Sequence, residues 1–180
     1  AAVDRLAPKL FARGVHTIIA CEMPRRRAAM HLDTLFTRID RDRCLIYPPL
    51  VESPEALGVR VWRVTARDGR VPAGSHLLSA LADCGVSLAP VYCGGDDPIA
   101  WQREQWSDGA NAFALAPGVI ITYGRNEKTL HELSRVGYEV LLPEAFVRNA
   151  PRYGAAHGHP VAIALGGHEL VRGRGGPRCL

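Results

Sequence analysis

The sequence predicts a mixed α/β domain assembled from ββαβ units, in which two strands are followed by a helix and a further strand. Two observations predict this class. Short β-branched or alternating apolar runs recur along the 180 residues, and amphipathic helices separate some of them. The ββαβ order occurs at least twice, unlike the simple βαβ alternation of a doubly wound sheet. Hydrophobic residues make up 47% of the chain and charged residues 22%, as in globular proteins with a buried core.

The first half of the chain contains the first ββαβ unit and the elements around it. The expected elements are, in order, a helix at 3–13, strands at 15–21, 34–39, 43–47 and 57–66, a helix at 75–84 and a strand at 86–92. Gly14 ends the first helix, and the polar residues 40–42 form a tight turn between two strands. Ser75 is the expected N-cap of the second helix.

The second half repeats this order and then becomes irregular. We expect strands at 112–116 and 118–123, a helix at 126–136 opened by Asn126, a strand at 138–142 and a last strand at 161–165. Residues 143–160 lose the periodicity and are rich in Pro, Gly and His, so we interpret them as a loop insertion. The whole of 1–180 is expected to form one domain.

Charge and cysteine usage restrict the possible partners and compartment. The net charge is +4 and the pI is about 9.0, but the one dense basic run, Arg25–Arg27, has no aromatic neighbour. A solvated loop explains that run better than a nucleic-acid surface, so nucleic acid is not an expected partner. Five scattered cysteines without a C-x-x-C pair argue against a disulfide framework and against a zinc ribbon. They favour a reducing compartment.

The start of the chain and its apolar runs extend this expectation. No basic region leads into an apolar one at residue 1, and no apolar run approaches the roughly 20 residues that cross a bilayer. We therefore expect a cytoplasmic protein without a membrane partner. Because the chain opens without methionine and in the middle of an apparent helix, we also expect it to be a piece of a longer protein.

The segment 172–179 (RGRGGPRC) is the first candidate for chemistry. Its glycines let the backbone approach a ligand closely, and arginines beside Cys179 favour the thiolate, which is the reactive form of a thiol. A flexible basic terminus with an inert cysteine explains this segment, taken alone, equally well.

A second candidate is the segment 30–34 (MHLDT), just before a predicted strand. In an extended segment His31 and Asp33 project to the same face, because side chains alternate with a period of two. The imidazole could then move protons while the carboxylate binds a cationic substrate. A structural pairing of the two residues is the alternative.

The remaining histidines do not predict a metal site. His157, His159 and His168 lie in the irregular C-terminal third, and their spacing matches no strong ligand pattern. We therefore expect neither a metal nor another cofactor.

Several segments, taken in order, resemble the arginine deiminases of the guanidino-group modifying (pentein) superfamily. The matching segments are 30–34 with 36–37 and 40–42, 103–106 with 108–111, 116–120, 123–129 and 172–179. The segments MHLDT and RGGPRC are the most specific, and they favour arginine deiminase over the dimethylarginase and amidinotransferase relatives. The resemblance implies a five-bladed α/β propeller of ββαβ modules, of which 1–180 would supply only the later blades.

The resemblance also implies an activity and a site. The expected reaction is hydrolysis of L-arginine to L-citrulline and ammonia through a covalent thiouronium intermediate. Cys179 would be the nucleophile, His31 the general acid and base, and Asp33 an anchor for the substrate guanidinium. Gly173 and Arg174 match the loop that contacts or gates the substrate.

Some of the family's functional groups have no counterpart in this chain. They are a second guanidinium-binding Asp, the Glu that partners the histidine and the arginines that bind the substrate carboxylate, all of which belong to an N-terminal half. We therefore expect that half, or a second chain, to complete the site, and a homo-oligomer is possible. The alternative is a non-catalytic pentein-like module that binds a guanidino compound or assembles with another chain.

Overall fold

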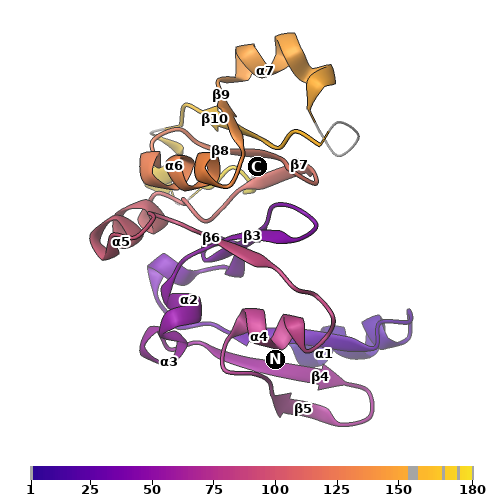
Figure 1. The fold of residues 1–180 in the computed structure, drawn as a ribbon. Helices are drawn as coiled ribbons and strands as arrows, with labels where there is room; N and C mark the ends of the chain where they lie inside the picture. Colours follow the sequence, from indigo (N-terminus) through magenta and orange to yellow (C-terminus); the bar gives the residue numbers. More distant parts are fainter. Residues whose placement is uncertain (1, 154–157, 168, 174, 180) are drawn as a thin grey trace. The chain divides into compact units, whose positions relative to one another are not determined.

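The computed structural model describes residues 2–153, 158–167, 169–173 and 175–179 (Figure 1). Helices and strands are mixed along the chain, which confirms the predicted α/β class. The chain forms two compact units: unit 1 comprises residues 1–25 and 49–87, and unit 2 comprises residues 26–48 and 88–180. No helix among the described residues has the length and apolar character needed to cross a membrane.

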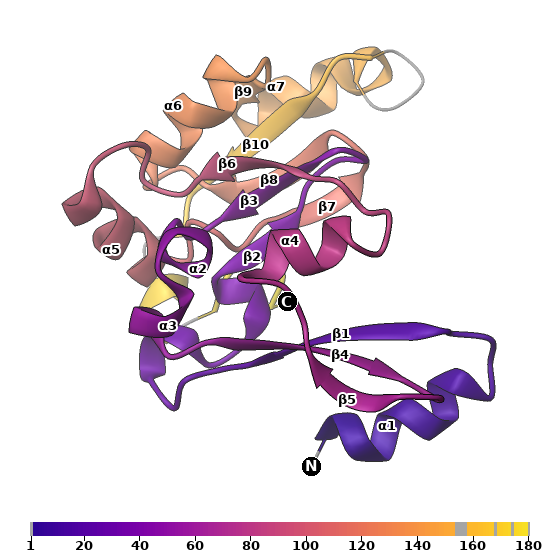
Figure 2. The same ribbon diagram turned by 60° about the horizontal axis from the view of Figure 1, so that its bottom comes forward.

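Unit 1 is built on an antiparallel sheet in the order β1-β4-β5 (Figure 2). The strands are β1 (Thr17–Glu22), β4 (Arg60–Thr65) and β5 (Gly69–Pro72), and the helices are α1 (Ala2–Phe11), α2 (Pro49–Glu52), α3 (Pro54–Leu57) and α4 (Leu77–Ala82). The sequence predicted α1, β1, β4 and α4, but not β5, α2 or α3. The three missed elements are only four residues long, too short to show a periodicity.

The expected cap of α4 is wrong by one residue. His76, not Ser75, is the N-cap, and its Nδ1 atom accepts a hydrogen bond from the backbone N–H of Ser79 at 3.2 Å. The hydroxyl of Ser79 accepts in return from the backbone N–H of His76 at 3.2 Å. A neutral imidazole nitrogen can replace the usual hydroxyl or carboxylate in a capping box, which a search for Ser, Thr, Asp or Asn overlooks.

Unit 2 contains a three-stranded sheet in the order β2-β3-β6. β2 (Phe36–Arg38) and β3 (Arg43–Ile46) form the predicted antiparallel pair, and β6 (Ala89–Tyr92) lies parallel to β3. In the turn, Asp40 Oδ1 accepts a hydrogen bond from the backbone N–H of Arg41 at 2.6 Å. Because β2 stands at one end of the strand order, it forms an edge of this sheet.

A four-stranded sheet in the order β7-β8-β10-β9 completes unit 2. Its elements are β7 (Phe113–Ala116), β8 (Val119–Tyr123), the helix α6 (Glu127–Arg135), β9 (Glu139–Leu141) and β10 (Val161–Leu165). All five were predicted. What the order of elements did not reveal is that β10 inserts between β8 and β9 and runs parallel to both. This central place explains its uninterrupted apolar sequence, VAIAL.

The two faces of the four-stranded sheet pack against different elements. Ile120 and Ala162 join the cluster formed with Leu133 of α6 and with residues of the three-stranded sheet, Leu45 and Val91 among them. Their sequence neighbours Val119, Val161 and Ile163 face the opposite way, toward Phe146 and Tyr153. Because strand side chains alternate between faces, both inner strands are covered on two sides.

The predicted loop insertion at 143–160 is wrong for its first part. A helix, α7 (Pro143–Asn149), and a short 3-10 helix at Ala150–Arg152 occupy it. The rings of Phe146 and Tyr153 stack with centroids 5.7 Å apart against the outer face of the sheet. Phe146 and Tyr153 are the described residues of this segment in the cluster, and two rings do not make the apolar stripe of an amphipathic helix. Residues 154–157 lie outside the described residues.

A further helix in unit 2, α5 (Pro98–Trp106), was not predicted. Asp97 is its N-cap and accepts from the backbone N–H of Ile99 at 2.9 Å, and Pro98 occupies the first turn. Its buried residues are Ala100, Glu104 and Gln105. Because two of these three are polar, the helix lacks the apolar stripe by which amphipathic helices are identified.

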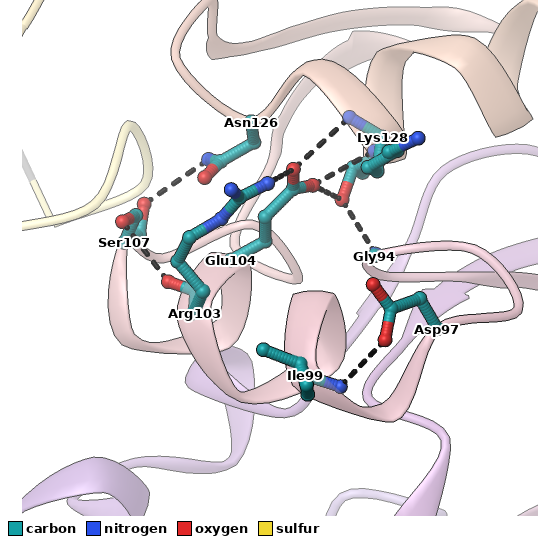
Figure 3. A network of polar contacts seen from close by, with 9 residues as sticks. Gly94, Asp97, Ile99, Arg103, Glu104, Ser107, Asn126 and Lys128 are labelled. Carbon is teal, nitrogen blue, oxygen red and sulfur yellow. Dashed lines mark hydrogen bonds and ion pairs between the residues drawn. The ribbon is translucent and has the colours of Figure 1, made fainter.

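The carboxylate of Glu104 joins α5 to α6 (Figure 3). Glu104 is 1% exposed, and its oxygens accept hydrogen bonds from the backbone N–H groups of Lys128 at 3.0 Å and Thr129 at 2.8 Å. The Thr129 hydroxyl donates a further bond at 2.7 Å. A carboxylate from another helix thus caps the N-terminus of α6, where free N–H groups and the helix dipole favour a negative charge. Asn126 holds the N-cap position, but its amide donates to the carbonyl oxygen of Ser107 at 3.1 Å instead.

Replacing Glu104 with Gln is expected to destabilise the protein by about 2–3 kcal/mol, because an amide nitrogen then faces buried N–H donors. Urea unfolding measures the change. Glu127→Gln is the control, because Glu127 is exposed in the first turn of the same helix and should contribute less than about 1 kcal/mol. Equal destabilisation by both variants would contradict the proposed importance of the Glu104 bonds.

Candidate active site in unit 2

A pocket of about 730 Å³ opens between the edge strands β2 and β7 of unit 2. Its walls carry both polar and apolar side chains. The lining residues are His31, Leu32, Asp33, Phe36, Thr37, Arg38, Ala112, Phe113, Ala114 and Arg178. The structure therefore brings His31 and Asp33 to one pocket, together with the residue that precedes Cys179.

The prediction that His31 and Asp33 share a face because their segment is extended is wrong. Residues Leu32–Thr34 form a 3-10 helix rather than an extended segment, so strict alternation does not apply. The Thr34 hydroxyl donates to the carbonyl oxygen of His31 at 2.7 Å and closes this turn. Both side chains still reach the pocket, because the turn places them on one wall.

Helix α5 holds this segment through Gln105. The buried side-chain amide of Gln105 donates to the carbonyl oxygen of Ala28 and to that of Thr34, the latter at 3.3 Å. These two carbonyls lie on either side of His31 and Asp33 in the sequence. Gln105 thereby fixes the backbone that carries both pocket side chains.

Asp33 has the chemistry expected of a cation-binding group. Its Oδ1 atom is buried and has no hydrogen-bond partner among the described residues, although the residue lines the pocket. A buried carboxylate oxygen is costly to leave without a donor. A ligand that brings N–H donors and a positive charge would satisfy it.

Cys179 lies beside the pocket rather than on its wall. It is exposed, and its backbone N–H donates to the carbonyl oxygen of Gly176 at 2.9 Å, which closes a tight turn. Asn111, just before β7, accepts from the backbone N–H of Arg178 at 2.9 Å, and its Nδ2 atom lies 4.0 Å from Cys179 Sγ. Gly173 ends a 3-10 helix at Leu170–Gly173, is exposed and does not line the pocket. Arg174 lies outside the described residues.

The five cysteine thiols differ in their exposure to solvent. Cys44 and Cys93 are buried, and loss of hydration raises the pKa of each thiol to about 12. Burial also raises the pKa of Cys21, to about 11. Cys84 and Cys179 are the exposed thiols. Exposure therefore allows Cys179 to act on a ligand, whereas Cys44 and Cys93 are structural.

No metal site is evident in the part of the chain that the structure describes, where no three His, Cys, Asp or Glu residues are arranged to hold an ion. His157 and His168 lie outside that part. The titratable groups at the pocket are an imidazole, a carboxylate and two guanidinium groups, those of Arg38 and Arg178, with a thiol nearby.

The side-chain chemistry of Gln105 and Asn111 did not predict a role for them at the site. Both lie in segments that entered only through the family resemblance, 103–106 and 108–111. Tyr123, at the end of β8, donates from its hydroxyl to the carbonyl oxygen of Gly175 at 2.7 Å and was missed in the same way. Each is a polar residue that becomes buried, and no local signal in the sequence predicts its contact.

Fold and pocket together define a mixed α/β protein with a candidate thiol-bearing site. Comparison with known proteins identifies the family: the arginine deiminase model matches residues 1–180, and the chain belongs to that family.

Relatives named arginine deiminase confirm this membership. The chain is 36% identical over 185 residues to the protein of Bacillus cereus strain B4264, covering 99% of this chain and 40% of that protein. It is 33% identical over 183 residues to the protein of Mycoplasma capricolum subsp. capricolum, with 99% and 39% covered. It is also 36% identical over 183 residues to that of Mycobacterium marinum, with 100% and 39% covered. The chain thus spans about 40% of the length of these relatives.

Thiol labelling tests the environment of Cys179. Near neutral pH, iodoacetamide is expected to alkylate Cys179 faster than Cys84, because hydrogen bonds hold the turn that carries the Cys179 sulfur and the Nδ2 atom of Asn111 lies 4.0 Å from it. Cys44 and Cys93 should react at least ~100-fold more slowly than Cys179, since burial keeps them protonated. Mass spectrometry of the labelled peptides gives each rate. Equal rates for Cys179 and Cys84 would remove the argument for an activated thiol.

Proposed function

We propose that the protein containing this chain is an arginine deiminase that hydrolyses L-arginine to L-citrulline and ammonia. One observation carries the proposal: a buried carboxylate oxygen of Asp33 without a partner among the described residues, in a pocket shared with His31 and Arg178. Membership of the family and the adjacent thiol of Cys179 agree with it.

The guanidinium group explains why these residue types are needed. It is a planar cation with several N–H donors, so the free oxygen of Asp33 can accept from it and hold it in place. Resonance spreads the charge over the group and makes its carbon a weak electrophile. Attack therefore requires a strong nucleophile such as the thiolate of Cys179.

The proposed reaction has two steps. The sulfur of Cys179 bonds to the guanidinium carbon and a C–N bond breaks, while His31 gives a proton to the departing ammonia. A thiouronium adduct remains on the sulfur. In the second step neutral His31 takes a proton from water, whose oxygen bonds to the same carbon. The C–S bond then breaks and the hydroxyl of the adduct gives its remaining proton to solvent, which releases citrulline and the thiolate.

Gly173 and Arg174 are proposed to form the loop that contacts or gates the substrate. Gly173 lies six residues before Cys179 in the same tail, which supports a location near the pocket. Its lack of a Cβ atom would let the backbone approach a substrate closely.

The rest of the site is proposed to come from outside this chain. The chain covers about 40% of the length of its relatives, and Asp33 is the one carboxylate among the described residues that line the pocket. We infer that an N-terminal half, or a second chain, brings the remaining groups that bind the substrate, and that a homo-oligomer is one way to do so. The ββαβ order and the two open-edged sheets of unit 2 support later blades of a pentein-type propeller over 1–180. The five unpaired cysteines support a cytoplasmic location.

In the full-length protein, Cys179→Ser is expected to abolish citrulline release from arginine, because a hydroxyl is a much weaker nucleophile than a thiolate. Asp33→Asn should lower kcat/KM by about 100-fold or more, since the buried charge that pairs with the guanidinium is lost. Citrulline is measured by its colour reaction. Cys84→Ser, at the other exposed cysteine, is the matched control and should retain activity.

Two results would count against this function. Absence of citrulline above the Cys179→Ser background rejects the enzymatic proposal. If arginine nevertheless protected Cys179 from alkylation, the chain would be the guanidino-binding module without catalysis.

The 180-residue chain expressed alone is expected to release almost no citrulline, because the groups that would complete the site lie outside it. A circular dichroism spectrum typical of a mixed α/β fold is the control that the isolated chain has folded. Rapid turnover by this chain would show that its own residues complete the site.

A further inference from the structure

We propose that Asn111 is a positioning residue for Cys179, whose side chain fixes the backbone of the 176–179 turn and directs an amide N–H toward the sulfur. Tyr123 supports Gly175, the residue that precedes this turn. The inference rests on the proposed role of Cys179 as the nucleophile and concerns how that nucleophile is held.

The two ends of one side-chain amide serve two consecutive residues of the turn. Asn111 Oδ1 accepts from the backbone N–H of Arg178 at 2.9 Å, and Nδ2 lies 4.0 Å from Cys179 Sγ. The first contact decides the orientation of the amide, because only an oxygen can accept from that N–H. The nitrogen, a donor, must then face the sulfur.

The turn rests directly on Asn111. The side chain is 0% exposed, and a Cβ atom placed on Gly176 would overlap the Cγ and Oδ1 atoms of Asn111. Gly176 is therefore required by close packing rather than by an unusual backbone angle. With Pro177 also buried, the turn has little freedom to move the sulfur away from Asn111.

Tyr123 holds the turn at Gly175. Its hydroxyl donates to the carbonyl oxygen of Gly175 at 2.7 Å, and its ring occupies the space that a Cβ atom on Gly167 would need. Burial, with the nearby Asp108 and Cys179, raises the pKa of the phenol above its usual range. The phenol therefore keeps its proton and remains a donor at neutral pH.

These contacts explain how an exposed thiol can remain both accessible and fixed. A long N–H···S contact stabilises a thiolate more than a thiol, because the donor interacts with the negative charge. Misplacement of a reacting atom by about 1 Å can cost about 100-fold in rate. Asn111 therefore fixes the position of the sulfur and places an amide N–H beside it.

The decisive variant is Asn111→Asp in the full-length protein. Aspartate keeps an oxygen for the N–H of Arg178 but presents a second, negatively charged oxygen to the sulfur instead of an amide N–H. The pH midpoint of Cys179 alkylation by iodoacetamide should rise by about one unit or more. The value of kcat should fall at least ~10-fold while KM changes less than ~3-fold. Thr122→Val, a near-isosteric change at a buried residue of β8, should leave the midpoint, kcat and KM unchanged.

Tyr123→Phe provides a second measurement that does not depend on the first variant folding. It removes only the hydroxyl that bonds Gly175, and it should lower kcat about 3–10-fold with KM unchanged. A double variant with Asn111→Ala should lose less than the sum of the two single losses, because both residues hold one turn.

An unchanged alkylation midpoint in a folded Asn111→Asp protein overturns the proposal, whatever happens to Tm or kcat. If that variant does not fold, an unchanged kcat in Tyr123→Phe overturns it instead. Alkylation does not require turnover, so the test remains valid even if the protein releases no citrulline. Failure of the proposed function and failure of this positioning role are thus distinguishable.

Discussion

The arrangement of unit 2 depends on the hydrogen bonds that the buried carboxylate of Glu104 accepts. A charge removed from water is tolerated only when donors surround it, and here the first turn of α6 provides them through Lys128 and Thr129. The carboxylate thus joins α6 to α5, a helix in which two of the three buried residues are polar. The position of α5 in turn determines where the polar side chains that follow Glu104 in the sequence can make contacts.

One short segment, 104–111, then makes three different connections. Glu104 holds α6, Gln105 holds the turn that carries His31 and Asp33, and Asn111 holds the turn that carries Cys179. The pocket residues and the thiol come from opposite ends of the sequence of unit 2, but they are fixed to the same frame. Because segment 104–111 makes these three connections, most of its residues are buried although few of them are apolar.

The pocket and the thiol show complementary chemistry. Asp33 has a buried oxygen that lacks a donor among the described residues, while Cys179 stays exposed and receives an amide N–H. A guanidinium cation would supply the donor that Asp33 lacks and place a carbon near the sulfur. The buried thiols of Cys44 and Cys93 have raised pKa values and are protected from the same chemistry. Burial thus distinguishes a reactive cysteine from structural ones.

The sequence by itself determined the mixed α/β class, most strands of the three sheets, and the candidate residues His31, Asp33 and Cys179, because apolar periodicity and short motifs are local signals. It did not reveal α5 or α7, whose buried faces are polar or depend on two aromatic rings. Only the tertiary structure placed β10 between β8 and β9, and only it joined Gln105 and Asn111 to the turns they support. These contacts connect residues up to 77 positions apart. No local pattern encodes them, since each depends on which polar groups are left without water when the chain is packed.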